Sequence, residues 1–281
     1  MPFPVQYIPA AYSLTAVGVW GTSDFLGGFG SRRANAFLFT AIAHVSGLIV
    51  IGVLALRSGA PFLTPVSLGW ALISGMLGGI ALALFYRSLA MGNMGLVAPV
   101  AAVLGAAIPS IVTAFAEGVP TRRHLLGFIL AVIGVWLISR TEGVAGRPQG
   151  LGMAVLAGIG FAGFYLCVHQ AGDASVLWIA TCSRCGALFV TGSIVLFGKH
   201  IRAVAAPVLA IAVVAGILDI TGSVVFIRAA QIGRMDDAVV LSSLYPAVTV
   251  LLARIFLHEH FSRFRTVGMI AALIAVPMIA G

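Results

Sequence analysis

Three charged side chains lie inside long apolar stretches of this sequence: Asp24, Arg184 and Asp219. A charge at the centre of a membrane-spanning helix costs about 2.5–3.5 kcal/mol, so such residues usually have a partner or a function. A carboxyl group there can bind a cation or carry a proton, and a guanidinium can bind an anion or neutralise an acid. For Asp219 three interpretations stay open: a structural pair with Arg184, a role with substrate or protons, and a solvated cavity wall.

Aromatic side chains accompany these polar groups at helical spacing. Trp20 precedes Asp24 by four residues, which places both side chains on one face of a helix. Phe161 and Tyr165 have the same spacing at the equivalent place in the second half of the chain. We expect these pairs to form two walls of one cavity. The alternative is that Asp24 caps a helix end while Trp20 belongs to an aromatic belt at the membrane surface.

A third group of candidates surrounds a proline late in the chain. Ser243, Tyr245 and Pro246 lie within an apolar segment. Proline has no backbone N–H and frees a carbonyl one turn earlier, which is tolerated at membrane depth where the backbone lines a cavity. Pro99 and Pro109 are expected to act similarly in an earlier segment. A simple kink required for packing would explain the same prolines.

The elements that position these residues are membrane-spanning helices. Hydrophobic residues make up 60% of the chain and charged residues only 9%, a composition that excludes a soluble globular protein. Apolar runs of about twenty residues, each long enough to cross a bilayer as a helix, recur throughout. Ten spans are predicted, at about 10–29, 36–56, 68–90, 94–116, 122–140, 150–170, 175–197, 205–229, 236–257 and 263–280.

The charged residues also argue against nucleic acid as a partner. The net charge is +8, but it comes mainly from scattered arginines near the ends of the predicted spans. No basic face with interleaved aromatic residues is present, as a nucleic-acid site would require. Positive charge at membrane edges is the simpler explanation.

The sequence of the second half repeats that of the first. At a constant offset of 141 residues, Arg228 matches Arg87, Gly233 matches Gly92, Arg263 matches Arg122 and Gly268 matches Gly127. Ile and Ala matches are common by chance in an apolar chain, so these Arg and Gly matches carry the argument. We predict two copies, at residues 1–140 and 142–281.

Five spans in each copy have a geometric consequence. An odd number of crossings inserts the second copy upside down relative to the first. The fold class is therefore predicted to be an all-α integral membrane protein with ten transmembrane helices in two inverted five-helix repeats. Inverted repeats recur in secondary transporters, whose substrate sites lie near the membrane midplane between the repeats.

Short motifs in both halves resemble the EamA-type domains of the drug/metabolite transporter superfamily. The segment Trp20–Ser23 resembles the Trp-Gly-small opening of the first helix in such domains. The end of the fourth helix, a Glu followed by a short turn and a Gly-containing fifth helix, is matched twice, by Glu117, Arg122 and Gly127 and by Glu259, Arg263 and Gly268. The second copy departs from the pattern, since it opens with Gly160–Phe161–Ala162. The resemblance covers nearly the whole chain and is nearest to bacterial exporters of aromatic amino acids and other metabolites.

The resemblance and the residues together predict a transporter and its site. We expect export of small metabolites, in particular aromatic or other apolar amino acids, by alternating access through a central cavity lined by spans 1, 3, 4, 6, 8 and 9. The predicted substrate-binding residues are Trp20, Asp24, Phe85, Phe161, Tyr165, Asp219, Phe226, Ser243 and Tyr245. The alternatives are a channel and an intramembrane enzyme; a channel would need a polar ring repeated by oligomerisation, and an enzyme a cluster of His, Asp or Ser.

No cofactor, metal or catalytic activity is expected. The sequence contains no Walker-type loop, G-x-S-x-G or H-E-x-x-H motif, so transport must draw on a gradient instead of ATP bound by this chain. Cys182 and Cys185 form a C-x-x-C pair, but two small thiols inside a helix explain it more simply than a metal or redox site. The expected partners are a small-molecule substrate, the lipid bilayer of a bacterial inner membrane and, where transport is coupled, protons carried by Asp24 or Asp219. We expect a monomer.

Overall fold

The protein is all α-helical in the residues that the computed structural model describes, which are 8–91, 94–117, 121–139, 149–258 and 263–280. That part of the chain contains no strand. Its helices are α1 (Ile8–Ser31), α2 (Ala36–Arg57), α3 (Pro65–Met91), α4 (Met94–Glu117), α5 (Arg122–Ser139), α6 (Leu151–Gln170), α7 (Val176–Phe197), α8 (Ala206–Ile232), α9 (Met235–Ser242), α10 (Tyr245–Leu257) and α11 (Arg263–Ala280).

Each predicted span coincides with one helix, except that the ninth is divided into α9 and α10. The interruption falls at Ser243 and Leu244, directly before Tyr245 and Pro246, which begin α10. Here the backbone tightens, since Leu244 N–H donates to Leu241 O at 3.2 Å and Ala247 N–H donates to Leu244 O at 2.9 Å. The Ser243 hydroxyl donates to Val239 O at 2.7 Å. The proline therefore breaks this span, as its missing N–H suggests.

The fourth span does not behave in the same way. Pro99 and Pro109 both lie inside α4, which continues from Met94 to Glu117. Neither proline divides its helix in the way that the ninth span is divided before Pro246. Each still lacks the N–H that would bond to the carbonyl four residues earlier, so each removes one hydrogen bond from α4.

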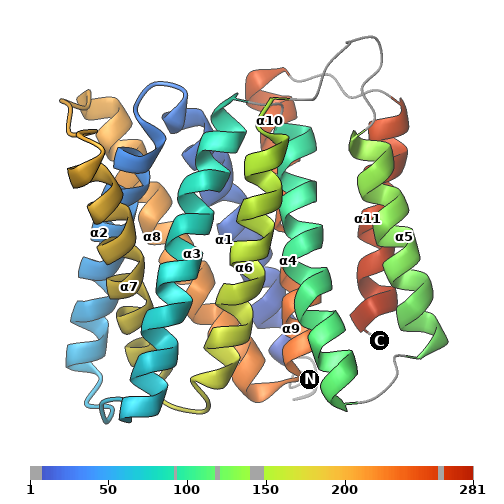
Figure 1. The fold of residues 1–281 in the computed structure, drawn as a ribbon, viewed down its shortest axis with the longest axis horizontal. Coiled ribbons are helices and arrows are strands. Elements are labelled where there is room, and N and C mark those ends of the chain that lie inside the picture. Colours follow the sequence, from blue (N-terminus) through green and yellow to red (C-terminus); the bar gives the residue numbers. More distant parts are fainter. Residues whose placement is uncertain (1–7, 92–93, 118–120, 140–148, 259–262, 281) are drawn as a thin grey trace, which may run out of the picture.

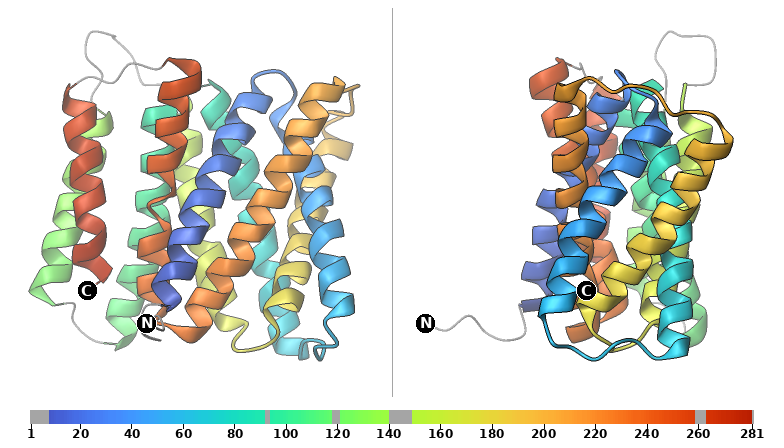
Figure 2. Two further views of the ribbon diagram at one scale, coloured as in Figure 1. Left: turned by 180° about the vertical axis from the view of Figure 1, so that it is seen from behind. Right: turned by 90° about the vertical axis from the view of Figure 1, so that its left-hand side faces the viewer.

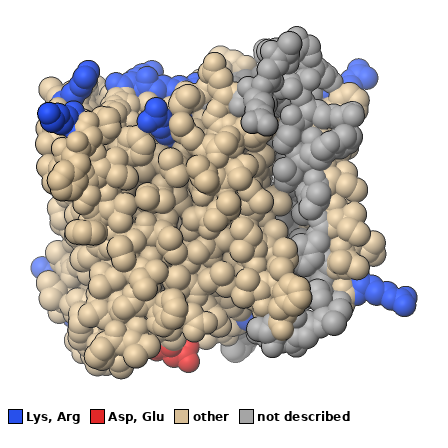
Figure 3. Space-filling model, in the orientation of Figure 1, with Lys and Arg blue, Asp and Glu red and all other residues tan. Residues whose placement is uncertain are grey.

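Seven segments are long and apolar enough to cross a membrane, judged by length and composition over the described residues. They are Ala36–Arg57, Pro65–Met91, Met94–Thr113, Leu151–Gln170, Val176–Phe197, Ala206–Ile232 and Met235–Leu257. On the face shown in Figure 3, Lys and Arg side chains gather at the upper and lower edges and leave the band between them uncharged. This is the distribution expected of a multi-pass membrane protein. The count of ten spans stays a prediction.

The helices stand side by side and alternate in direction (Figure 1). In the main body α1 packs against α8, α3 against α6 and α7, α4 against α6, and α2 against α7 and α8. Helices α5 and α11 pack against each other and form one end of the molecule (Figure 2). Helix α1 begins and α11 ends near the lower edge of Figure 1, so both described ends of the chain lie on one side.

Glycines set how closely the central helices approach. A Cβ on Gly75 of α3 would collide with the backbone carbonyl of Ser183 in α7, and one on Gly216 of α8 would collide with that of Ala43 in α2. Contacts between small residues of this kind are typical of membrane helix interfaces. They hold α2 and α7 close enough to α8 and α3 for the side chains of all four helices to reach the interior.

Candidate functional site

A cavity of about 660 Å³, including the part open to solvent, lies among the central helices. Helices α1, α2, α3, α6, α7, α8 and α10 contribute to its walls. The residues that line it are Trp20, Asp24, His44, Gly75, Gly78, Gly79, Leu82, Phe161, Phe164, Tyr165, Ala180, Ser183, Arg184, Ala187, Asp219, Ile220, Ser223, Ile227 and Tyr245.

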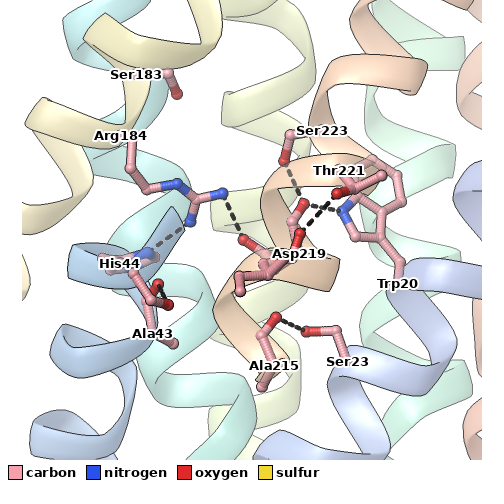
Figure 4. Close-up of polar contacts among 12 residues, drawn as sticks. Trp20, Ser23, Ala43, His44, Ser183, Arg184, Ala215, Asp219, Thr221 and Ser223 are labelled. Atoms are coloured by element: carbon pink, nitrogen blue, oxygen red, sulfur yellow. Dashed lines mark hydrogen bonds and ion pairs between the residues drawn. The ribbon is translucent and has the colours of Figure 1, made fainter. Parts of the chain in front are cut away.

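One wall of the cavity holds a buried chain of charged and polar side chains (Figure 4). Arg184 Nη2 lies 2.6 Å from Asp219 Oδ2, and Arg184 Nη1 donates to His44 Nδ1 at 2.6 Å. Because Nδ1 accepts this bond, the imidazole is neutral and carries its proton on Nε2. Helices α2, α7 and α8 are thereby linked. Of the interpretations open for Asp219, the structure places it in an ion pair with Arg184.

The opposite wall comes from α1, which is fixed to α8 by two hydrogen bonds. The Trp20 indole N–H donates to Asp219 O at 3.2 Å, and the Ser23 hydroxyl donates to Ala215 O at 2.8 Å. A Cβ on Gly222 would collide with the Trp20 ring, so this glycine leaves room for the indole against α8. These contacts place Asp24, one turn after Trp20, in the cavity wall.

Asp24 differs from Asp219 in having no partner. Asp24 is buried, with only 4% of its surface exposed. Within the described residues its carboxyl group makes no hydrogen bond or ion pair, and its main electrostatic neighbour is the like charge of Asp219. The cavity thus contains two carboxyl groups and one guanidinium.

Aromatic rings form a continuous cluster around these polar groups. The Trp20 ring centroid lies 5.5 Å from that of Phe226, 6.3 Å from Tyr165 and 6.4 Å from Tyr245. Phe85 packs edge-on against Phe161 at 5.5 Å and against Tyr245 at 6.3 Å. Such distances are within the range of favourable aromatic pairs. The rings give the cavity apolar walls on rigid helices.

Six of the nine predicted site residues line the cavity: Trp20, Asp24, Phe161, Tyr165, Asp219 and Tyr245. The other three do not. Phe85 and Phe226 are fully buried behind the walls, where they support the lining rings. Ser243 lies at the α9–α10 break and uses its hydroxyl on its own helix.

The helices that form the walls also differ from the prediction. Among the described side chains, α4 contributes no lining residue, whereas α2 and α7 contribute His44 and the face around Arg184. The close approach of α3 to α7 at Gly75 and Gly79 carries α7 to the cavity. His44, Phe164, Ser183 and Ser223 were missed. Their only sequence signal was a lone polar or aromatic side chain in an apolar span.

Cys182 and Cys185 are both free thiols, one buried and one exposed. No group of three or more His, Cys, Asp or Glu residues capable of holding a metal occurs in the described part of the chain. The Glu259 of the family motif lies outside the described residues, as does the junction between the predicted copies.

The helical bundle is that of a multi-pass membrane protein, and it contains a cavity among its central helices. Residues 8–140 and residues 148–281 each match the EamA-like transporter family, so the chain belongs to this family of membrane transporters, and the predicted resemblance is confirmed.

One solved crystal structure of a protein is similar to this chain over 96% of its length and 97% of the other chain, with a TM-score of 0.71 and 19% sequence identity. At that identity the similarity shows the fold alone. A comparison with curated protein sequences finds no match.

Proposed function

We propose that the protein is a secondary transporter of a bacterial inner membrane that exports small metabolites, in particular amino acids with aromatic or other apolar side chains. One observation carries the proposal: a cavity of about 660 Å³ between the two halves has aromatic walls and few polar groups. Apolar walls with a few placed polar groups are typical of small-molecule sites. The seven helices that line the cavity all come from one chain, which supports a monomer as the functional unit.

Alternating access between inverted repeats is the proposed mechanism, and the helix packing supports it. Contacts repeat in equivalent pairs: α1 packs on α8 as α6 packs on α3, and α2 packs on α8 as α7 packs on α3. Gly75 and Gly216 are 141 residues apart, and each allows close backbone contact at these equivalent interfaces, Gly75 with α7 and Gly216 with α2. The first helices of the two halves, α1 and α6, run in opposite directions (Figure 1). Rocking of one half against the other would expose the cavity to each side in turn.

The inverted arrangement predicts opposite labelling of equivalent loops. Ser58 directly follows α2, and Lys199 follows α7 at the equivalent place, 141 residues later; both are exposed. In a background with the three cysteines replaced, Ser58→Cys and Lys199→Cys are expected to react with an impermeant maleimide from opposite sides of the membrane. Labelling of both from the same side would contradict the inverted repeat.

The proposed cargo predicts a selective effect of the aromatic walls. Tyr165→Ala and Tyr245→Ala are expected to weaken phenylalanine transport more than alanine transport, by about 2- to 12-fold, since a stacked pair contributes about 0.5–1.5 kcal/mol beyond burial. Trp20→Ala should act similarly, with an added structural loss because its N–H holds α1 to α8. Counterflow in liposomes at matched protein insertion measures the ratio.

Phe189→Ala is the matched control, because Phe189 is 69% exposed on the outside of α7. It should leave the ratio unchanged. Saturable counterflow of phenylalanine by the parent protein is the test of the transporter proposal itself. Equal losses for both cargoes in all three variants would mean that the rings only support the fold.

A further inference from the structure

The charges in the cavity do not balance. Asp219 has its counter-charge in Arg184, at 2.6 Å, and the other terminal nitrogen of Arg184 is taken by His44. Asp24 lines the same cavity, is 4% exposed and has no hydrogen bond or ion pair within the described residues. A buried carboxylate without a partner is strongly unfavourable, so its ionised form requires a cation from outside the protein.

The surroundings of Asp24 suit an organic cation better than a metal ion. Hard cations such as Ca²⁺ take six or more oxygen ligands, and the described residues hold no cluster of three metal-ligating side chains. The cavity instead presents the rings of Trp20, Phe161, Phe164, Tyr165 and Tyr245. Ammonium groups are attracted to aromatic faces, and the Tyr245 hydroxyl, which is buried without a partner, is free to accept from one.

The same arrangement offers little to a cargo carboxylate. Both terminal nitrogens of Arg184, the lone cation among the cavity-lining residues, are already engaged. A carboxylate entering beside Asp24 would meet a negative charge that no cation of the cavity compensates, because Arg184 is paired with Asp219. An amino acid can therefore be held by its ammonium group and its side chain, while its carboxylate adds no attraction.

We infer that Asp24 anchors the cargo's ammonium group, and that the cavity selects protonated primary amines with an aromatic or apolar body whether or not they carry a carboxylate. This inference rests on the proposed transport function and specifies which end of the cargo is recognised. Decarboxylated amines are then expected to be cargoes at least as good as the amino acids.

Competition by three phenylalanine analogues tests the inference without any substitution. Phenethylamine keeps the ring and the ammonium group, and 3-phenylpropanoate keeps the ring and the carboxylate. N-acetylphenylalanine keeps the ring, the carboxylate and the nitrogen, but its nitrogen is an uncharged amide. In liposome counterflow, phenethylamine is expected to inhibit phenylalanine exchange at concentrations equal to or below those of phenylalanine itself. The two analogues without an ammonium group should be at least about tenfold weaker, because a charge-assisted hydrogen bond is lost.

A variant then assigns the effect to Asp24. Asp24→Asn keeps the side-chain shape and is expected to weaken phenethylamine binding by about tenfold or more, while binding of 3-phenylpropanoate is unchanged or improved. Quenching of tryptophan fluorescence in detergent gives a readout apart from transport. Asp24→Glu should recover part of the affinity, and Asp173→Asn, in the exposed turn after α6, is the control.

The outcomes separate the two proposals. If phenylalanine is transported but N-acetylphenylalanine competes as well as phenethylamine, the ammonium anchor is wrong and the transport function stands. Unchanged amine affinity in Asp24→Asn would overturn the anchor in the same way. If amines are carried and amino acids are not, the anchor holds and the amino-acid cargo is wrong. Absence of binding and transport for every compound would overturn both.

Discussion

Replacing Arg184 with methionine is expected to destabilise the protein by about 3–5 kcal/mol, the cost of leaving one partner of a buried ion pair without its counter-charge. Arg184 is 6% exposed, and its guanidinium joins Asp219 to His44 across three helices. Methionine fills much of the arginine volume, so the loss reports the charge and its hydrogen bonds more than a void. Unfolding by SDS in mixed micelles, followed by circular dichroism, measures the free-energy difference.

The double variant Arg184→Met with Asp219→Leu separates charge from packing. Replacing both members of a buried pair by apolar residues is often neutral or stabilising, so the double variant should recover at least half of the loss. Arg57→Met, at the exposed end of α2, is the control and should change stability by less than about 1 kcal/mol. A single variant as stable as this control, or a double variant no better than the single one, would contradict a structural role for the pair.

Hydropathy predicted the helices of this protein well because a bilayer imposes one dominant rule. Every backbone group must be satisfied within its own helix, and each helix needs about twenty apolar residues. The apolar runs therefore located the helices, and Pro246 located the break between α9 and α10. The intramembrane charges stood out for the same reason, since few are tolerated. Asp24, Arg184 and Asp219 all reach the cavity.

The rotation of each helix and its neighbours could not be predicted in the same way. Nearly every face of a membrane helix is apolar, so hydrophobicity does not mark the side that faces the cavity. Phe85 and Phe226 were predicted to line it but lie behind it, while Phe164 lines it. The outcome depends on backbone approaches at glycines such as Gly75 and Gly216, which a sequence with many glycines does not single out. His44 became a site residue only through its contact with Arg184, 140 positions away in the chain.

Loss of gradient-driven accumulation in Asp24→Asn is the second large effect that we expect. Either a proton or the cargo's ammonium group can neutralise the Asp24 carboxyl, but both cannot occupy it together. A transporter that must fill this position before reorienting would exchange one for the other. Under one-to-one exchange, a pH difference of one unit would support about a tenfold accumulation of cargo, equivalent to about 1.4 kcal/mol.

We expect Asp24, and not Asp219, to carry this exchange because of the groups around each residue. Its charged neighbour on α8 is Asp219, which Arg184 already compensates. The other titratable groups near it are tyrosine hydroxyls, those of Tyr86 on α3, Tyr165 on α6 and Tyr245 on α10. The remaining group in the cavity is His44, whose Nδ1 is occupied by Arg184. Asp24 is thus the acidic group left available to a proton or a cargo.

Liposomes loaded at one pH and diluted into another measure the coupling. The parent protein is expected to accumulate labelled phenylalanine against its concentration gradient when the pH difference is imposed, and Asp24→Asn is expected to reach only equal concentrations. At equal pH inside and outside, the variant should still show counterflow, at a reduced rate, because exchange needs no proton. Asp173→Asn should accumulate cargo like the parent. If Asp24→Asn accumulates as much cargo as the parent, the coupling lies on another group. If the parent itself does not accumulate cargo, transport is facilitated diffusion, and the Asp24 carboxyl then binds the cargo but no coupled proton.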